Sequence, residues 1–184
     1  MNEIVLENTL LSLLKFTPGL GRVHVYKALL MIDAFYYAYF KESLTGITYI
    51  KDWYGPVPDF KAKNAISNFK SIYHSRQEIF DFSQFKHFTK QSPDYSVFKN
   101  EEETLEIIRT VAQFVNKKWA KQLSELTHDE AYYSANMGEV IPLEAIYKIT
   151  TKAEAWTKKE KELLTKDIEE ISQSANFDLS SYCR

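Results

Sequence analysis

The feature that most constrains the fold is the segment from Tyr26 to Phe40, which reads YKALLMIDAFYYAYF. Hydrophobic residues occupy nearly every position around the helical turn, not just one face. Such a helix is stable in water only when neighbouring elements cover it on most sides, so we expect it to be the central buried helix. The apolar run is interrupted by Lys27 and Asp33 and is short for a bilayer, so no membrane partner is expected.

Length and composition limit the classes of protein that this chain can belong to. A chain of 184 residues can bury one sizeable core, and 45% hydrophobic with 15% aromatic residues excludes a disordered chain. The formal charge of -2 gives no basic excess for a polyanion, so nucleic acid is not expected as a partner. Cys183 is the one cysteine, and the amino terminus lacks the features of a signal peptide, which together favour a cytoplasmic location.

Four further helices are predicted from apolar residues at three- and four-residue spacing and from capping patterns. They cover Asn2–Lys15, Asp59–Tyr73, a segment from Asn100 (with Glu103 as a capping box) to a stripe that ends at Trp119, and a short segment capped by Thr127 that ends near Gly138.

Extended segments are fewer and shorter. Gly46 to Lys51 is β-branched and aromatic, and Glu78 to Thr89 alternates about Ser83-Gln84, which predicts a hairpin. Val140 to Leu143 is also expected to be extended, because a proline disfavours helix in the residue before it. We therefore predict an α+β fold, predominantly α-helical, as a compact single domain with a central buried helix and a small β element.

The domain is expected to span residues 1–150. Near Thr150 the composition becomes strongly charged, and Thr151 with Glu154 predicts a charged helix to about Ile171. Residues 151–184 are therefore interpreted as a charged helical extension and tail.

No pattern typical of a catalytic or metal site is found in the sequence. The four histidines show no ligand spacing, and Gly19-Leu20-Gly21 lacks the third glycine and the preceding strand of a phosphate-binding loop. No Gly-x-Ser-x-Gly motif is present. We predict no cofactor, no metal and no enzymatic activity.

Two acidic positions leave an enzymatic alternative open. Asp33 in the central helix could have a raised pKa and transfer protons, or it could accept hydrogen bonds from a backbone turn or a tyrosine hydroxyl. The structural role is favoured, because no second acid or base is identifiably placed beside it. For His128-Asp129-Glu130, capping and surface charge are favoured over acid–base chemistry, because neighbouring side chains on a helix diverge.

Backbone restriction is concentrated in WYGPVP, Trp53 to Pro58, which holds one of the five glycines and two of the five prolines. Proline fixes φ and restrains the residue before it, so this segment should be a stiff, extended ribbon from which Val57 projects. The ribbon either turns the corner into the next helix or forms a preformed recognition edge. The sequence leaves both possibilities open.

Five motifs occur in order from about residue 4 to 148 and together resemble a known family. They are Lys27-Ala28-Leu29-Leu30 through Tyr36-Tyr37, Thr45-Gly46-Ile47-Thr48-Tyr49-Ile50, Tyr54-Gly55-Pro56-Val57-Pro58, Leu126-Thr127-His128-Asp129, and Gly138-Glu139-Val140-Ile141-Pro142. This combination is typical of the Panacea domain, also described as the SocA-like antitoxin or the phage-associated GepA-type domain. The chain departs from the family pattern at Tyr132 and Tyr133, where a tryptophan is expected.

The resemblance implies a helical α+β domain that acts by binding protein. Members of the family neutralise a cognate protein toxin directly, and one type instead delivers its toxin to an AAA+ protease. Some members carry a DNA-binding domain, but no segment of this chain resembles a helix-turn-helix. On this basis the expected partner-binding residues are Trp53, Tyr54, Pro56, Val57, Pro58, His128 and Asp129.

Overall fold

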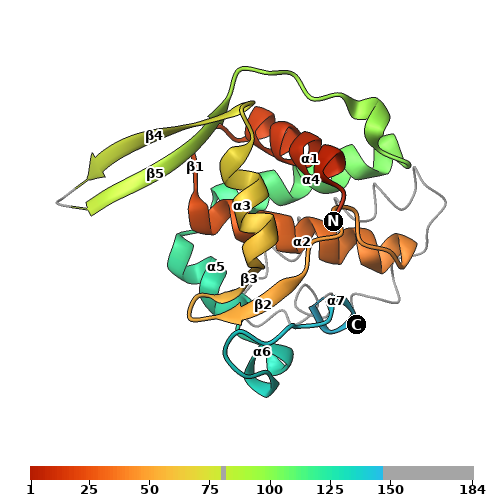
Figure 1. The fold of residues 1–184 in the computed structure, drawn as a ribbon, viewed down its shortest axis with the longest axis vertical. Coiled ribbons are helices and arrows are strands. Elements are labelled where there is room, and N and C mark those ends of the chain that lie inside the picture. Colours follow the sequence, from red (N-terminus) through yellow and green to blue (C-terminus); the bar gives the residue numbers. More distant parts are fainter. Residues whose placement is uncertain (80–81, 147–184) are drawn as a thin grey trace.

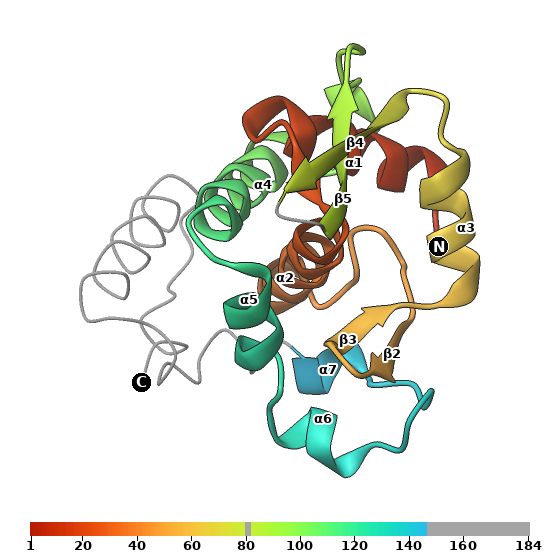
Figure 2. The same cartoon turned by 90° about the vertical axis from the view of Figure 1, so that its left-hand side faces the viewer.

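The computed structural model describes residues 1–79 and 82–146, which form a predominantly helical α+β domain, as predicted (Figure 1). Helix α2, Arg22–Phe40, lies at its centre, and Figure 2 shows it nearly end-on with the other elements around it. It is contacted by helices α4 (Glu101–Asn116), α5 (Ala120–Leu126) and α7 (Leu143–Ile146) and by strand β3 (Gly55–Pro58). The prediction of a central buried helix is confirmed.

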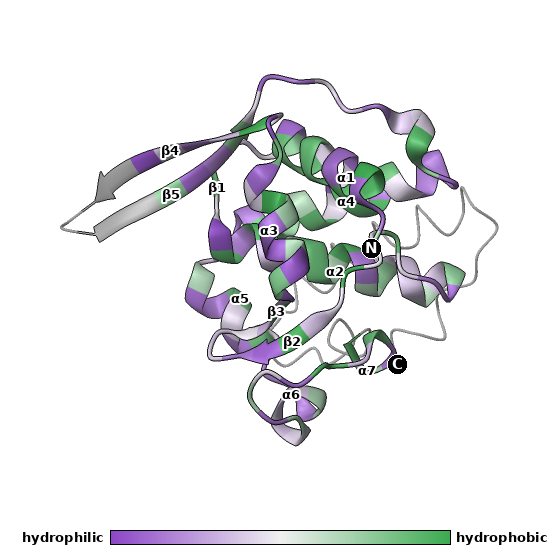
Figure 3. Cartoon of the chain, in the orientation of Figure 1, coloured by the Kyte–Doolittle hydropathy of each residue, from purple (hydrophilic) through white to green (hydrophobic). Residues whose placement is uncertain are grey.

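Helices α1, Glu3–Phe16, and α4, Glu101–Asn116, pack against each other, and α4 also packs on α2. Hydrophobic residues concentrate on these three helices (Figure 3). Both predicted helices are confirmed, but the capping box at Asn100 is wrong. The Asn100 side chain does not cap α4 and instead donates a hydrogen bond to Tyr36 Oη at 3.1 Å.

A three-stranded antiparallel sheet has the order β1-β5-β4, formed by Leu20–Gly21, Phe82–Thr89 and Ile72–Ile79 respectively. Strands β4 and β5 form a hairpin that projects from the helical body (Figure 1). The hairpin was predicted, but its turn was wrongly placed. Ser83 pairs with Glu78 and Gln84 with Gln77, so both residues lie within β5.

A second, two-stranded sheet joins β2, Tyr49–Asp52, to β3, Gly55–Pro58. Helix α3, Phe60–Asn68, follows, and Asp59 caps it by accepting a hydrogen bond from Ala62 N at 2.8 Å. The predicted extension of this helix to Tyr73 is wrong. Ile72 and Tyr73 belong to β4, where Tyr73 stacks on Phe88 at 5.6 Å, because these residue types favour cross-strand pairing.

The segment after α4 contains two departures from the predictions. Trp119 does not continue the buried stripe of α4: it is 79% exposed and precedes α5, Ala120–Leu126, a helix that the sequence analysis missed. Helix α6, Glu130–Ser134, is capped by Asp129 and not by Thr127, which ends α5.

Short elements complete the domain. They are the 3-10 helix η1, Tyr95–Val97, and helix α7, Leu143–Ile146. Val140 pairs with Ile50 in an isolated antiparallel bridge, as expected for the start of the extended segment, but Leu143 at its predicted end is the first residue of α7. The predicted boundary at residue 150 and the charged extension lie outside the described residues. Within the described ranges, none of the helices is both long and apolar enough to cross a membrane.

Asp33 is fully buried in α2 and fixes the loop that leads from α2 to β2. Its Oδ1 accepts hydrogen bonds from Ser43 Oγ and Thr45 N, each at 2.9 Å, and its Oδ2 accepts from Thr45 Oγ1 at 2.5 Å and Tyr49 Oη at 2.7 Å. Burial raises the pKa of this carboxyl, and the hydrogen bonds from Thr45, Tyr49 and Ser43 oppose the change. A backbone turn and a tyrosine hydroxyl are the partners that the favoured structural role predicted.

We expect Asp33→Asn to lower the free energy of unfolding by about 2–4 kcal/mol, because the amide group that replaces one oxygen leaves two of the four donors without an acceptor. Urea unfolding measures the effect. Glu102→Gln, which removes one charge from the exposed first turn of α4, is the control and should change stability by less than about 1 kcal/mol. Equal losses in the two variants would contradict this role for Asp33.

Candidate functional site

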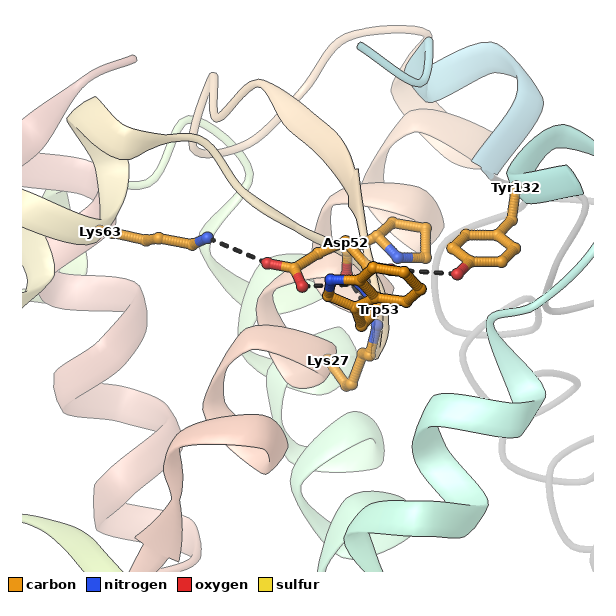
Figure 4. A network of polar contacts seen from close by, with 6 residues as sticks. Lys27, Asp52, Trp53, Lys63 and Tyr132 are labelled. Carbon is orange, nitrogen blue, oxygen red and sulfur yellow. Dashed lines mark hydrogen bonds and ion pairs between the residues drawn. The ribbon is translucent and has the colours of Figure 1, made fainter. Parts of the chain in front are cut away.

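The β2–β3 hairpin is anchored to the central helix by a buried lysine. Lys27 Nζ in α2 donates a hydrogen bond to Pro56 O at 2.7 Å, and the Lys27 side chain is 1% exposed (Figure 4). Burial lowers the pKa of Lys27 to about 7, although the nearby Asp52 carboxylate acts to raise it. Pro56 has no amide hydrogen of its own, so its carbonyl is the group through which this position of β3 binds α2.

Gly55 allows the chain to pass directly over this lysine. Its φ is 87°, and a Cβ atom here would overlap Thr127 Oγ1, lie 2.7 Å from Lys27 Nζ and lie 3.2 Å from His128 Cδ2. A side chain is therefore excluded both by the backbone conformation and by the space. Three motifs that are far apart in the sequence thus meet at one point: Lys27 of α2, Gly55 of the hairpin, and Thr127-His128 between α5 and α6.

His128 packs beside this point without forming an acid–base pair. Its ring stacks on Tyr132 with centroids 4.2 Å apart, and burial, then the charge of Lys27, lower its pKa. His128 Nε2 is buried and makes no hydrogen bond to any residue that the structure describes. Asp129 Oδ1 accepts from Tyr132 N at 2.9 Å, which confirms the favoured capping role for this stretch.

Helix α6 and the segment after it support the outer side of the hairpin. Lys51 Nζ donates to Ala135 O at 2.8 Å and lies 4.5 Å from the centroid of the Tyr132 ring. Tyr132 Oη donates to Asp52 O at 3.1 Å, and Asp52 forms an ion pair with Lys63 of α3 at 3.6 Å (Figure 4). Backbone hydrogen bonds connect Lys51 to residues 138 and 139. The hairpin is therefore held on three sides.

Large apolar side chains are exposed at the hairpin tip and along its support. We define the hairpin-tip surface by five residues with their exposed fractions: Trp53 at 77%, Tyr54 at 65%, Tyr133 at 70%, Met137 at 48% and Val140 at 53%. Exposed aromatic residues that stand on a rigid support are typical of protein interfaces.

The predicted partner-binding residues occupy different environments. Trp53 and Tyr54 are exposed, whereas Pro56, Val57 and Pro58 are buried in β3 and His128 and Asp129 are half-buried. The expectation that Val57 projects is wrong, because β3 packs flat on α2 and leaves Val57 only 6% exposed.

Sequence reasoning missed Met137 and Val140 as surface residues. Tyr133 was noted only as a departure from the family pattern. Adjacent residues of a helix point in different directions, so a buried Tyr132 leaves Tyr133 on the exposed side of α6.

Within residues 1–79 and 82–146, no three His, Cys, Asp or Glu side chains are grouped so that they could hold a metal ion. Asp33 lies inside the core with both oxygens hydrogen-bonded.

The family model of the antitoxin SocA-like, Panacea domain matches residues 25–134, which is more than half of the chain, and the chain belongs to this family. The matched range contains Lys27, Asp33, the whole β2–β3 hairpin and His128 to Tyr133. No curated protein and no solved structure gives a significant match.

We expect the stability advantage of the wild type over Lys27→Met to grow with pH. The unfolded chain holds a proton on Lys27 up to a pKa of 10.5 and the folded chain only to about 7, so unfolding takes up a proton between these values and the free energy of unfolding rises with pH. Between pH 7 and pH 9 the difference should increase by on the order of 2 kcal/mol in urea unfolding. A difference that is constant with pH would contradict the lowered pKa.

Comparing Gly55→Ala with Gly138→Ala distinguishes the cost of steric overlap at the new Cβ atom from the cost of backbone strain. Both glycines have positive φ, at 87° and 80°, but nothing lies within 4 Å of a Cβ at Gly138. We expect Gly138→Ala to lower the unfolding free energy by about 1 kcal/mol and Gly55→Ala by at least about 2 kcal/mol more. Thermal or urea unfolding measures both, and equal losses would show that the close approach of Gly55 to Lys27 has no energetic consequence.

Proposed function

We propose that this protein is an antitoxin of a bacterial or prophage toxin–antitoxin system and neutralises a cognate protein toxin by direct binding through the hairpin-tip surface. Its membership of the antitoxin SocA-like family supports the class of function. The observation that supports the surface is the exposure of Trp53 and Tyr54 at the end of a hairpin whose base is buried.

The hairpin suits this role because its conformation is fixed before any partner arrives. Two prolines, the Lys27 hydrogen bond to Pro56 O and the close packing of Gly55 hold β3, so the tip loses little conformational entropy on binding. Tryptophan and tyrosine provide large contact areas with few rotatable bonds and are frequent energetic anchors.

The other predicted partner-binding residues have a supporting role in this proposal. Pro56, Val57 and Pro58 bind the hairpin to α2, and His128 and Asp129 position α6 with its exposed Tyr133. Substitutions at these supports should therefore reduce stability first and binding second. Substitutions at the exposed tip should do the reverse.

Trp53→Ala should weaken toxin binding by at least about tenfold while leaving the unfolding temperature nearly unchanged, because an exposed anchor contributes to the complex and not to the core. The matched control is Trp119→Ala, since Trp119 is equally exposed, at 79%, but lies outside the hairpin-tip surface. Isothermal titration calorimetry with the purified toxin measures both variants. If the two variants bind equally well, the hairpin tip is not the interface.

The function itself is tested by expressing the neighbouring gene with and without this chain. We expect growth arrest by that gene alone and rescue by this chain; a harmless neighbour, or one that remains lethal, would contradict the proposal. Toxin half-life in cells with and without AAA+ proteases distinguishes the two modes of neutralisation. Occlusion leaves the toxin level unchanged, whereas an adaptor lowers it in a protease-dependent way.

A further inference from the structure

A cavity of about 980 Å³ lies where the amino end of α2 meets β1, β5 and the connection from α4 to α5. These elements lie side by side at the left of Figure 1, at the base of the projecting β4–β5 hairpin. Neither the family motifs nor the hairpin-tip surface use this cavity. Its volume is in the range of small-ligand sites, which are hundreds of cubic ångströms (roughly 300–1,000 Å³).

The charged side chains that line the cavity are all basic. They are Arg22, Lys86, Lys117 and Lys118, and the lining that the structure describes includes no Asp or Glu. The chain as a whole has 25 acidic and 23 basic residues, so this concentration of one sign does not reflect the composition. A concave site with one sign of charge attracts ligands of the opposite sign.

Three histidines also line the cavity. His24 Nε2 lies 2.8 Å from Lys118 O, His87 Nδ1 lies 2.9 Å from Leu20 O, and the rings of His74 and His87 meet edge to face at 4.7 Å. Burial lowers the pKa of His24 and His87. Lys86 lowers that of His24 further, and His74 and Arg22 lower that of His87, against the hydrogen bonds to Lys118 O and Leu20 O.

The amino end of α2 adds to the positive charge at the cavity. Gly21 provides no side-chain cap, and no acidic residue lies in the first turn of this 19-residue helix. The positive end of the helix dipole is therefore not compensated by the helix itself.

Two aromatic rings at the cavity are exposed to solvent. Trp119 is 79% exposed and Phe85 56% exposed, although the domain buries most of its other large apolar side chains. An exposed indole beside basic side chains can stack on a planar base while the cations bind its phosphates.

From this combination of shape, charge and exposed rings, we propose that the cavity binds a small phosphate-bearing ligand with a planar base, of the nucleotide class. The phosphates lie against Arg22, Lys86 and Lys117, and the base lies against Trp119. Side chains from three segments provide the site, so it needs no glycine-rich loop, which the sequence lacks. The proposal is independent of toxin binding and can be tested on the full chain alone.

The experiment is calorimetric titration of the full chain with GTP, ATP and inorganic tripolyphosphate at low ionic strength. We expect all three to bind, and Lys86→Glu combined with Lys117→Glu to weaken each by at least about tenfold, because two attractive charges become repulsive. The control, Lys61→Glu, changes an exposed lysine outside the lining and should alter binding less than about twofold. Unfolding temperatures confirm that each variant folds.

Trp119→Ala tests the base separately from the phosphates. It should weaken GTP and ATP by at least about fivefold and leave tripolyphosphate unchanged, because only the nucleotides have a ring to stack. Absence of nucleotide binding at millimolar concentration would overturn the proposal, as would nucleotide binding that the Lys86 and Lys117 changes or Trp119→Ala leave intact. If nucleotides fail to bind and the double variant instead weakens the toxin complex, the cavity is a protein interface and the nucleotide assignment is wrong.

Discussion

The structure depends on hydrogen-bonding two ionisable side chains that are buried in one helix. Lys27 and Asp33 lie on α2 and are 1% and 0% exposed. A buried charge is strongly unfavourable unless hydrogen bonds replace its lost water, and here the partners come from the chain that follows α2. Asp33 accepts hydrogen bonds from Ser43, Thr45 and Tyr49, and Lys27 donates one to Pro56 O. These hydrogen bonds to two side chains of α2 determine the path of the chain from α2 to the hairpin.

This arrangement shows how motifs that are far apart in the sequence together determine one part of the fold. Lys27 and Thr127 can approach residue 55 closely because it is a glycine. The Lys27 amine and the Thr127 hydroxyl occupy the space that a Cβ atom at residue 55 would need. None of the three is exposed enough to be a principal contact for another protein. Together they fix the position of Trp53 and Tyr54, which directly precede Gly55 and are exposed to solvent.

Sequence periodicity predicted the elements whose environment is uniform along their length. Helices α1, α2 and α4 follow from their apolar spacing, and the stiffness of β3 follows from its prolines. The role of Asp33 was also predictable, because a buried carboxylate has few alternatives, whereas the cap of α6 was expected at Thr127 and is Asp129. Prediction failed where a residue of the same type has two possible environments. Ile72 and Tyr73 fit the apolar spacing of α3 but pair with β5 in the sheet. Trp119 fits the apolar spacing of α4 but is exposed, because α4 ends at Asn116.

The candidate site was predictable as a set of residues but not as an arrangement. From the sequence, WYGPVP is a stiff ribbon, and its stiffness does not say which of its residues face the core. In the structure Lys27 binds Pro56 O, so Pro56 to Pro58 are buried while Trp53 and Tyr54 are exposed. Of the two alternatives left open by the sequence, the structure shows the corner: the carboxyl half of the hexamer leads into α3. The amino half is exposed, and its use as a recognition edge stays a prediction. Because the two halves are separated, the exposed pair can change without disturbing the buried support. A domain built in this way keeps its frame constant when its exposed residues differ.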